Sequence, residues 1–176
     1  MAPPSKRAKE RTVIGWREHI ALPDLGIDRI KAKIDTGART TALHAEGIEE
    51  FRHKGHLWVR FLTPPYHGPE CEPVSARVVD RREIRNTSGI PQERPIIHTT
   101  LVIDGRHWGI DVSLTDRRDM GFDLILGRTA VRRHGLLVDP GRSFLAGEPE
   151  RPAGAHLDIP DTPTGTDQAT PGKEDS

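Results

Sequence analysis

Residues 31–43 decide the fold, and they read Lys31-Ala32-Lys33-Ile34-Asp35-Thr36-Gly37-Ala38-Arg39-Thr40-Thr41-Ala42-Leu43. An apolar approach, an acidic turn and a return to small and apolar residues predict a strand that delivers one carboxylate, Asp35, to a tight loop. Gly37 would let the backbone fold closely behind that carboxylate. Far downstream, residues 122–128 form a second short apolar run that ends in Gly127-Arg128.

Outside this stretch, nearly every segment is short and extended, with turn signals between neighbours. Strands are expected over residues 12–16, 19–22, 27–34, 41–45, 49–54, 57–62, 75–84, 94–103, 107–114 and 136–140. Residues 63–73 hold four prolines and predict a loop, and Asp104-Gly105 predicts a hairpin turn. One short helix is expected over residues 128–134, closed by Gly135. The pattern predicts an all-β barrel or sandwich.

The two motif segments together resemble the retropepsin-like aspartic peptidases, in which Asp-Thr-Gly-Ala holds the catalytic carboxylate and an apolar-apolar-Gly-Arg segment packs behind it. The match is closer to a bacterial branch, the RimB-like proteins, which are also labelled ATP-dependent zinc proteases and are often found beside ATP-grasp glutamate ligases. The resemblance covers roughly residues 12–145 and includes Gly15-Trp16-Arg17-Glu18, Leu22-Pro23-Asp24-Leu25-Gly26, Ser88-Gly89, Arg94-Pro95 and Leu114-Thr115-Asp116-Arg117. It implies a closed acid-protease barrel.

The acidic loop carries the predicted chemistry. One carboxylate is a poor catalyst of peptide hydrolysis, whereas two that share a proton activate a water and protonate the scissile group. The chain has only one Asp-Thr-Gly, so a second copy would supply the other carboxylate across a two-fold axis. The resemblance implies that Asp35, Thr36 and Gly37 are catalytic, with Thr36 bonding across the axis and Gly37 presenting backbone to substrate. The alternative is a structural turn aspartate; Asp123 and Asp139, which lack a following Thr-Gly, are expected to be structural.

Arg39 departs from the viral pattern. Viral retropepsins carry an acidic residue directly after Asp-Thr-Gly-Ala, and it pairs with the arginine of the Gly-Arg segment. Here that position is Arg39, which would repel Arg128. Because an arginine guanidinium can donate two hydrogen bonds to one carboxylate, we expect Arg39 and Arg128 to bind acidic side chains of a glutamate-rich substrate. The alternatives are solvated arginines, or salt bridges from Asp123 or Glu46.

A long hairpin is expected to act as a flap over the cleft. Ser88-Gly89 lies at its predicted tip, with Arg85 and Arg94 on either side. A mobile, glycine-bearing flap excludes water and completes a site, although an ordinary exposed hairpin is the alternative. The predicted substrate-binding residues are therefore Ala38, Arg39, Arg85, Ser88, Gly89, Arg94 and Arg128.

Composition limits the other classes of function. The 26 basic and 26 acidic residues cancel, but residues 147–176 carry a net −5 and residues 1–10 a net +2. The middle therefore holds +3, which is too mild for a nucleic-acid groove. Cys71 is the only cysteine, so no intrachain disulfide can form, and we expect a cytoplasmic location. No stretch approaches the roughly 18 apolar residues of a membrane span, and the N-terminus lacks the apolar core of a signal peptide.

Metal and nucleotide cofactors are not predicted. The nine histidines form no His-Glu-x-x-His, and one cysteine cannot give paired thiolates at ligand spacing. His53 and His56 are three residues apart, but they lie in a polar turn with no clear third ligand. There is no Gly-x-x-x-x-Gly-Lys-Ser/Thr for nucleotide phosphates.

The predictions combine into one domain with two tails. Residues 1–11 would be a disordered basic lead, residues 12–146 the retropepsin-like peptidase domain and residues 147–176 a disordered acidic tail. The predicted function is that of a homodimeric aspartic endopeptidase acting on oligo-α-glutamate-like peptides. One rival is a non-catalytic protein that binds a glutamate ligase or a glutamylated protein through the same cleft; the other is a zinc-dependent hydrolase.

Overall fold

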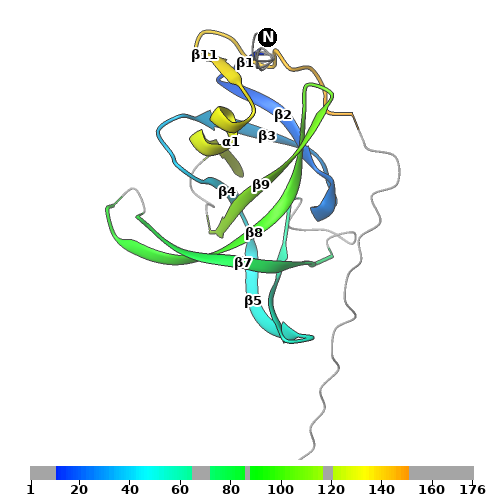
Figure 1. Ribbon diagram of the computed structural model, residues 1–176, viewed down its shortest axis with the longest axis vertical. Helices are drawn as coiled ribbons and strands as arrows, with labels where there is room; N and C mark the ends of the chain where they lie inside the picture. The colour runs from blue at the N-terminus through cyan, green and yellow to red at the C-terminus, as the bar shows by residue number, and fades with distance from the viewer. Residues whose placement is uncertain (1–10, 65–71, 86–87, 117–120, 151–176) are drawn as a thin grey trace, which may run out of the picture.

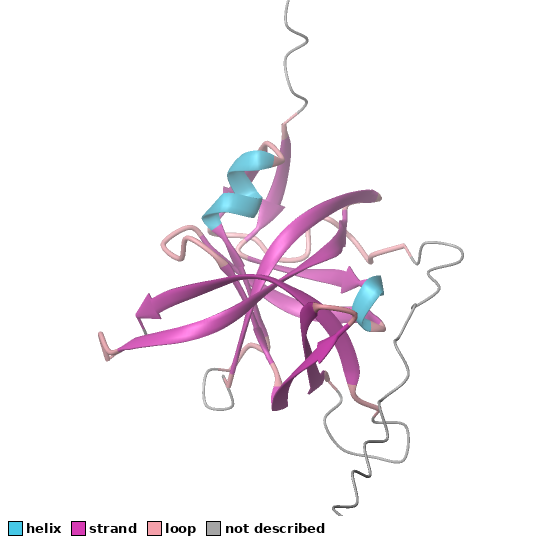
Figure 2. Ribbon diagram, turned by 60° about the horizontal axis from the view of Figure 1, so that its bottom comes forward, coloured by secondary structure: helices cyan, strands magenta, loops and turns pink. Residues whose placement is uncertain are grey.

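The computed structural model describes residues 11–64, 72–85, 88–116 and 121–150, and short strands dominate this part of the chain (Figures 1 and 2). The elements are β1 (Thr12–Gly15), β2 (Arg17–Leu22), the 3-10 turn η1 (Pro23–Leu25), β3 (Ile27–Asp35), β4 (Thr41–His44), β5 (Glu46–His53), β6 (His56–Leu62), β7 (Val74–Arg85), β8 (Pro91–Ile103), β9 (Arg106–Thr115), β10 (Leu124–Gly127), α1 (Arg128–Arg133) and β11 (Leu136–Asp139). The all-β prediction with one short helix is confirmed.

The strands form one large sheet that closes on itself. Its order is β2-β3-β10-β4-β9-β8-β7-β6-β5, and a further pairing of β2 with β8, through Ala21 and Val102, joins six of the strands into a ring. Strands β7, β6 and β5 continue outward from that ring, as Figure 1 shows at its lower side. Strands β1 and β11 form a separate two-stranded parallel ribbon.

The core lies inside the ring. Along β3 the alternation expected from the sequence is present, because Ile30, Ala32 and Ile34 are buried while Lys31 and Lys33 are exposed. The largest fully buried side chains come from the ring strands, from β1 and β6 and from η1: Phe61, Ile14, Ile20, Leu22, Leu25, Leu43, Ile96, Ile97, Leu101, Ile103, Leu114 and Leu124. One apolar cluster therefore holds the described domain together.

Several element bounds differ from the sequence expectation. Strand β5 begins at Glu46 rather than Glu49, and the β7–β8 hairpin is longer than expected, because β7 runs to Arg85 and β8 begins at Pro91. The run before Gly127 is itself a strand, β10, which sequence reasoning treated only as a packing segment. Residues 1–10, 65–71 and 151–176, which carry most of the predicted lead, proline loop and tail, lie outside the described residues.

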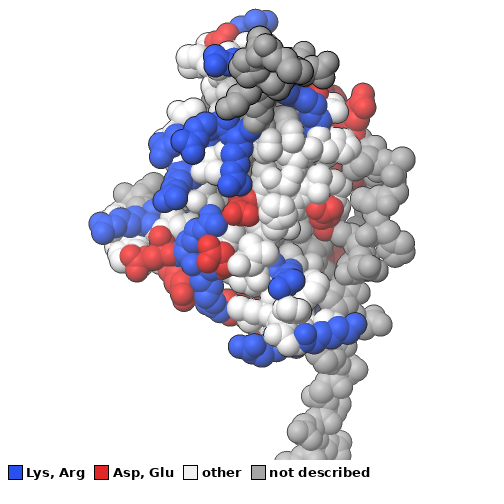
Figure 3. Space-filling model, viewed as in Figure 1, with Lys and Arg blue, Asp and Glu red and all other residues white. Residues whose placement is uncertain are grey.

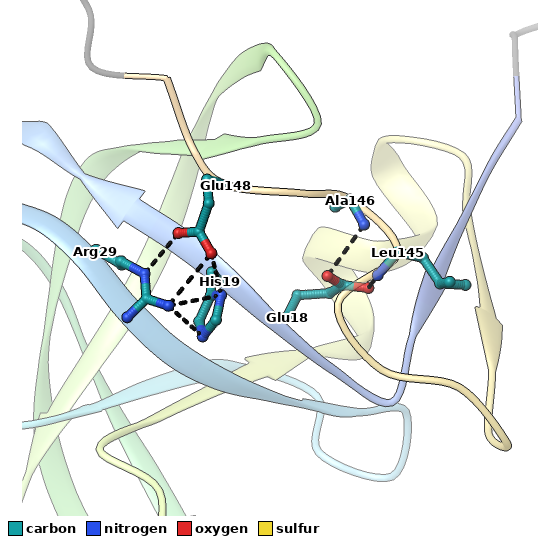
Figure 4. Close-up of polar contacts among 6 residues, drawn as sticks. All are labelled: Glu18, His19, Arg29, Leu145, Ala146 and Glu148. Atoms are coloured by element: carbon teal, nitrogen blue, oxygen red, sulfur yellow. Dashed lines mark hydrogen bonds and ion pairs between the residues drawn. The ribbon is translucent and has the colours of Figure 1, made fainter.

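A buried carboxylate fastens the C-terminal segment to the domain. Glu18 has no exposed surface, and its oxygens accept hydrogen bonds from the backbone N–H groups of Leu145 at 2.9 Å and Ala146 at 3.2 Å (Figure 4). The backbone N–H of Gly15 also donates to this carboxylate. A buried charge is tolerated when such donors satisfy it. The described structure thus includes this anchored segment and extends to residue 150.

Strand β10 lies between β3 and β4, the two strands that the acidic loop connects. It runs parallel to β3 and antiparallel to β4, so that Gly127 lies beside Asp35. The backbone of residues 40–41 presses on Gly127: a Cβ built there would lie 2.5 Å from the Thr40 carbonyl carbon and 2.7 Å from the Thr41 nitrogen. Glycine is required here by space rather than by backbone angles, since its φ is −78°.

We predict that Gly127→Ala lowers the free energy of unfolding by about 2 kcal/mol, because the backbone must move to admit the methyl group. Urea unfolding followed by tryptophan fluorescence measures this. Gly141→Ala is the matched control, since the nearest atom to its Cβ would be an Asp139 carboxylate oxygen at 3.4 Å. Equal losses in the two variants would show that the close approach at Gly127 has no energetic consequence.

Candidate functional site

Asp35 lies at the end of β3, where the chain turns into the loop of residues 36–40. The side chain is half-buried, and its Oδ1 accepts hydrogen bonds from the backbone N–H groups of Gly37 at 3.0 Å and Ala38 at 3.1 Å. A Cβ at Gly37 would lie 3.2 Å from the same oxygen, so the tight turn favours glycine. Among the described residues, Oδ2 accepts no hydrogen bond. The carboxylate is therefore held by one oxygen and presents the other.

Backbone contacts with β10 and α1 fix the rest of the loop. The N–H groups of Arg128 and Thr129 donate to the carbonyls of Ala38 at 2.7 Å and Arg39 at 3.2 Å. At the centre of this contact, the N–H of Gly127 donates to the buried hydroxyl of Thr41 at 3.1 Å. The first amides of α1 thus satisfy loop carbonyls instead of remaining open to solvent. A loop tied at both ends holds its carboxylate in one position.

Next to this loop is a cavity of about 650 Å³, which the β7 arm of the hairpin, β9 and α1 complete. Its lining comprises Gly37, Ala38, Arg39, Thr40, Thr41, Arg82, Glu83, Ile84, Arg85, Gly109, Ile110, Asp111, Thr129, Ala130, Arg133 and His134. The volume is within the range of sites that hold small ligands or a few peptide residues. The β7 arm of the hairpin and the acidic loop therefore line the same hollow.

Arginine dominates the charge of this cavity. Arg39, Arg82, Arg85 and Arg133 line it against the carboxylates of Glu83 and Asp111. In Figure 3, basic side chains gather along the side of the molecule where Figure 1 places α1, the loop after β3 and the tip of the β7–β8 hairpin. Within the described ranges no ion pair is found for Arg39, Arg85 or Arg133. The hollow thus has positive charge that the described residues do not neutralise.

Arg82, in contrast, belongs to an internal network. Its Nη2 donates to Asp111 Oδ2 at 3.0 Å and its Nε to Asp80 Oδ2 at 2.8 Å, while His98 Nδ1 lies 3.0 Å from Asp111 Oδ1. The hydrogen bond with His98, followed by the hydrogen bond and charge of Arg82, lowers the pKa of Asp111. Asp80 chiefly, with Asp111, raises the pKa of Arg82. The network braces β7 against β8 and β9 at the cavity floor.

The structure brings together part of the predicted substrate-binding set. Ala38, Arg39 and Arg85 line the cavity, together with Gly37 from the predicted catalytic set. Asp35 and Thr36 lie at the adjoining turn and are not among the lining residues. Ser88 and Gly89 lie exposed at the described part of the hairpin tip, where Gly89 has a φ of +76°.

Arg128 and Arg94 have local partners. The Arg128 guanidinium donates to the Thr36 carbonyl at 3.2 Å, so this residue braces the acidic loop as well as being exposed. Arg94 is only 8% exposed, its Nε donates to Gln92 Oε1 at 3.2 Å, and burial lowers its pKa. Neither Asp123 nor Glu46 forms an ion pair with Arg39 or Arg128 among the described residues.

Sequence reasoning missed most of the cavity lining, including the polar residues Arg133, Thr129 and Asp111. Arg133 and Thr129 come from the predicted helix and Asp111 from a predicted strand, but their approach to the loop depends on non-local packing. Strand β9 gave one usable signal, because the charged Asp111 stands between the buried Ile110 and Val112. A polar residue at such a position often marks a buried network or a site.

Within the described ranges, no group of three or more His, Cys, Asp and Glu side chains is arranged to hold a metal ion. His53 and His56 oppose each other as the last pair of the β5–β6 hairpin. No helix of the described chain is both long and apolar enough to span a membrane.

A closed all-β domain with one Asp-Thr-Gly loop, braced by an apolar-Gly-Arg strand and facing a hairpin, defines the retropepsin-like class. Residues 13–149 match the profile described as RimB-like, retropepsin-like aspartic endopeptidase RimB. The chain belongs to this family.

The chain is also similar to curated relatives and to a solved structure. The chain is 38% identical over 141 residues to a probable alpha-L-glutamate ligase from Shewanella pealeana and 36% identical over 140 residues to one from Desulfotalea psychrophila. These matches cover 77% and 78% of this chain but only 30% of each relative, so the chain spans about a third of their length. The crystal structure of Lpg0085 from Legionella pneumophila, of unknown function, is 28% identical with a TM-score of 0.66, covering 78% of this chain and 99% of that one.

We predict that Asp111→Asn lowers stability at neutral pH and that this difference disappears in acid. Because its pKa is held below the ordinary value of an aspartate, Asp111 stabilises the folded state at pH values above its unfolded pKa. That contribution is lost as the pH falls through the lower folded value. The loss at pH 7 should be below about 1 kcal/mol, since the group is partly solvated.

Urea unfolding of both proteins between pH 7 and pH 2.5 measures this. Glu49→Gln, at an exposed position of β5 with no described ion pair, controls for the change of charge. A stability difference for Asp111→Asn that stays constant across the range would contradict the assignment of the network.

Proposed function

We propose that this chain is an aspartic endopeptidase that works as a homodimer, with Asp35 of each copy activating one water between them. The observation that carries the proposal is the presentation of Asp35, which stands on a loop fixed at both ends, beside an arginine-rich cavity, with Oδ2 open. A turn aspartate needs only its capping hydrogen bonds, whereas this loop is also braced by β10, by α1 and by the Arg128 side chain.

The chemistry needs one proton shared between two carboxylates. Like charges about 3 Å apart do not both ionise, so one aspartate is the base and the other the acid, as in aspartic proteases generally. The ionised carboxylate takes a proton from water, whose oxygen attacks the peptide carbonyl carbon. The protonated carboxyl donates to the carbonyl oxygen, and a proton then passes to the leaving nitrogen as the C–N bond breaks.

The exposed apolar surface of the β1–β11 ribbon supports association of two copies. Val13 and Leu137 are cross-strand partners on the β1–β11 ribbon, and they are 50% and 45% exposed. Neither strand of this ribbon is paired with the large sheet. An open, apolar strand edge favours pairing with another copy. Thr36 and Gly37, which would meet their counterparts at the axis, are exposed as well.

The cavity charge supports an acidic substrate. Arg39, Arg85 and Arg133 converge on the hollow without a described ion pair, and a second copy would double the set. Guanidinium groups bind carboxylates in a two-pronged way. The similarity to probable alpha-L-glutamate ligases connects such a chain with glutamate polymers. We therefore propose oligo-α-glutamate peptides or glutamylated protein tails as the substrate class, with the β7–β8 hairpin closing over them.

One observation favours a second candidate. In the glutamate ligase relatives, the segment similar to this chain makes up only 30% of the protein. A domain that accompanies a ligase would also serve as a non-catalytic module that binds the ligase or its glutamylated product. In that case the cavity would bind acidic chains without cleaving them.

We predict that Asp35→Asn lowers peptide turnover by roughly 1,000-fold or more, because an amide does not accept a proton from water. Purified protein is incubated with oligoglutamate and with a neutral peptide, with and without a chelator, and the products are identified by mass spectrometry. The wild-type protein should cleave oligoglutamate in preference to the neutral peptide, and the chelator should not change the rate of cleavage.

Asp139→Asn is the matched control, because an asparagine there would still accept the Gly141 N–H bond that Asp139 Oδ1 accepts at 2.9 Å. Oligoglutamate that binds but is never cleaved by the wild-type protein would favour the binding module. Cleavage that survives in Asp35→Asn but stops with the chelator would favour a zinc hydrolase.

A further inference from the structure

Three cations form a row on the outer face of β3. Arg29, Lys31 and Lys33 alternate with the buried Ile30, Ala32 and Ile34, so they point away from the core. Their row is extended by Arg17 and His19 of β2, which are the cross-strand partners of Lys33 and Lys31. We call Arg29, Lys31 and Lys33 the β3 track. Within the described chain, Lys31 and Lys33 have no ion pair.

A glutamate of the chain itself already occupies one end of the track. Glu148 Oε2 accepts from Arg29 Nε at 2.6 Å, its Oε1 from Arg29 Nη2 at 3.3 Å, and Oε1 lies 2.9 Å from His19 Nδ1 (Figure 4). His19 is held in place by Phe144, on which it stacks with ring centroids 4.3 Å apart. The hydrogen bond from Arg29 lowers the pKa of Glu148. This contact shows how the surface binds one glutamate carboxylate.

The other end of the track leads to Asp35. Side chains two residues apart on a strand share a face, so positions 29, 31, 33 and 35 form one line along β3. An extended peptide has the same repeat of about 6.6 Å between alternate side chains. A glutamate chain lying along β3 would therefore place alternate carboxylates on successive track cations. From Arg29 to Asp35 the distance along the strand is about 20 Å.

We propose that the β3 track binds an extended acidic peptide and guides it toward the Asp35 loop, and that Glu148 competes with it for Arg29. The track lies on β3, whereas the cavity is built from the loop after β3, β7, β9 and α1. It is thus a second acidic-chain site, outside the cavity. Binding to the track needs no catalysis, and only its guiding role rests on the proposed function.

The test measures binding of a fluorescent peptide of about ten glutamates, long enough to span the track, to full-length protein carrying Asp35→Asn. Fluorescence anisotropy compares the triple variant Arg29→Ala/Lys31→Ala/Lys33→Ala with the matched variant Arg52→Ala/Arg60→Ala/Arg77→Ala. The control removes the same charge from β5, β6 and β7, and no ion pair is described for its three arginines. Urea unfolding verifies that both variants are folded.

The track variant should bind the peptide roughly tenfold more weakly than the control variant. Glu148→Gln should bind it roughly two- to fivefold more tightly than the parent, because Arg29 loses its competitor. Equal affinities of the track and control variants would overturn the proposal, as would a Glu148→Gln variant that binds no better. A single-stranded oligonucleotide bound with the same dependence on the track would also overturn it, since the surface would then recognise any polyanion.

The two proposals fail in different ways. If the wild-type protein cleaves nothing but the track variant loses binding, the proposed function fails and the acidic-chain site stands. If oligoglutamate is cleaved and the track variant has the KM of the control variant, the peptidase stands and the track proposal is overturned.

Discussion

The insertion of β10 between β3 and β4 is the constraint on which the rest of the structure depends. Two strands joined by a five-residue connection would ordinarily pair with each other, but here a distant segment separates them. The connection is forced open into a loop, and its carbonyls become available to the first amides of α1. Gly127 makes this possible because only a residue without a side chain fits against the backbone at Thr40. The carboxylate of Asp35 is positioned as a consequence.

Acidic side chains around this loop make contacts within the domain, whereas basic side chains line the cavity beside it. Glu18 accepts hydrogen bonds from the backbone N–H groups of residues 145 and 146, and Asp111 forms hydrogen bonds with Arg82 and His98. Arg39, Arg85 and Arg133 have no such partners in the described structure. Glu148 shows that a glutamate side chain binds the basic surface of β2–β3 through a two-pronged arginine contact. A substrate with carboxylate side chains would pair with the basic groups of both the cavity and the β2–β3 surface.

Much of this could be predicted from local patterns. The alternation along residues 27–34, the Asp104-Gly105 turn and the short helix closed at Gly135 are encoded within a few residues, and each was confirmed. The resemblance located the acidic loop and the Gly-Arg segment. The roles of particular arginines could not be predicted, because they depend on which backbone carbonyl or side chain lies nearby after folding. Arg128 and Arg94 thus have local partners, while Arg133 lines the cavity.

The central claim is that one active site contains an Asp35 from each of two chains. Mixing wild-type and Asp35→Asn proteins at a fixed total concentration, with time for subunits to exchange, tests it directly. If both aspartates are needed, oligoglutamate turnover falls as the square of the wild-type fraction, since only pairs of wild-type chains are active. Turnover that falls in proportion to the wild-type fraction would mean that each chain acts alone, which contradicts the account.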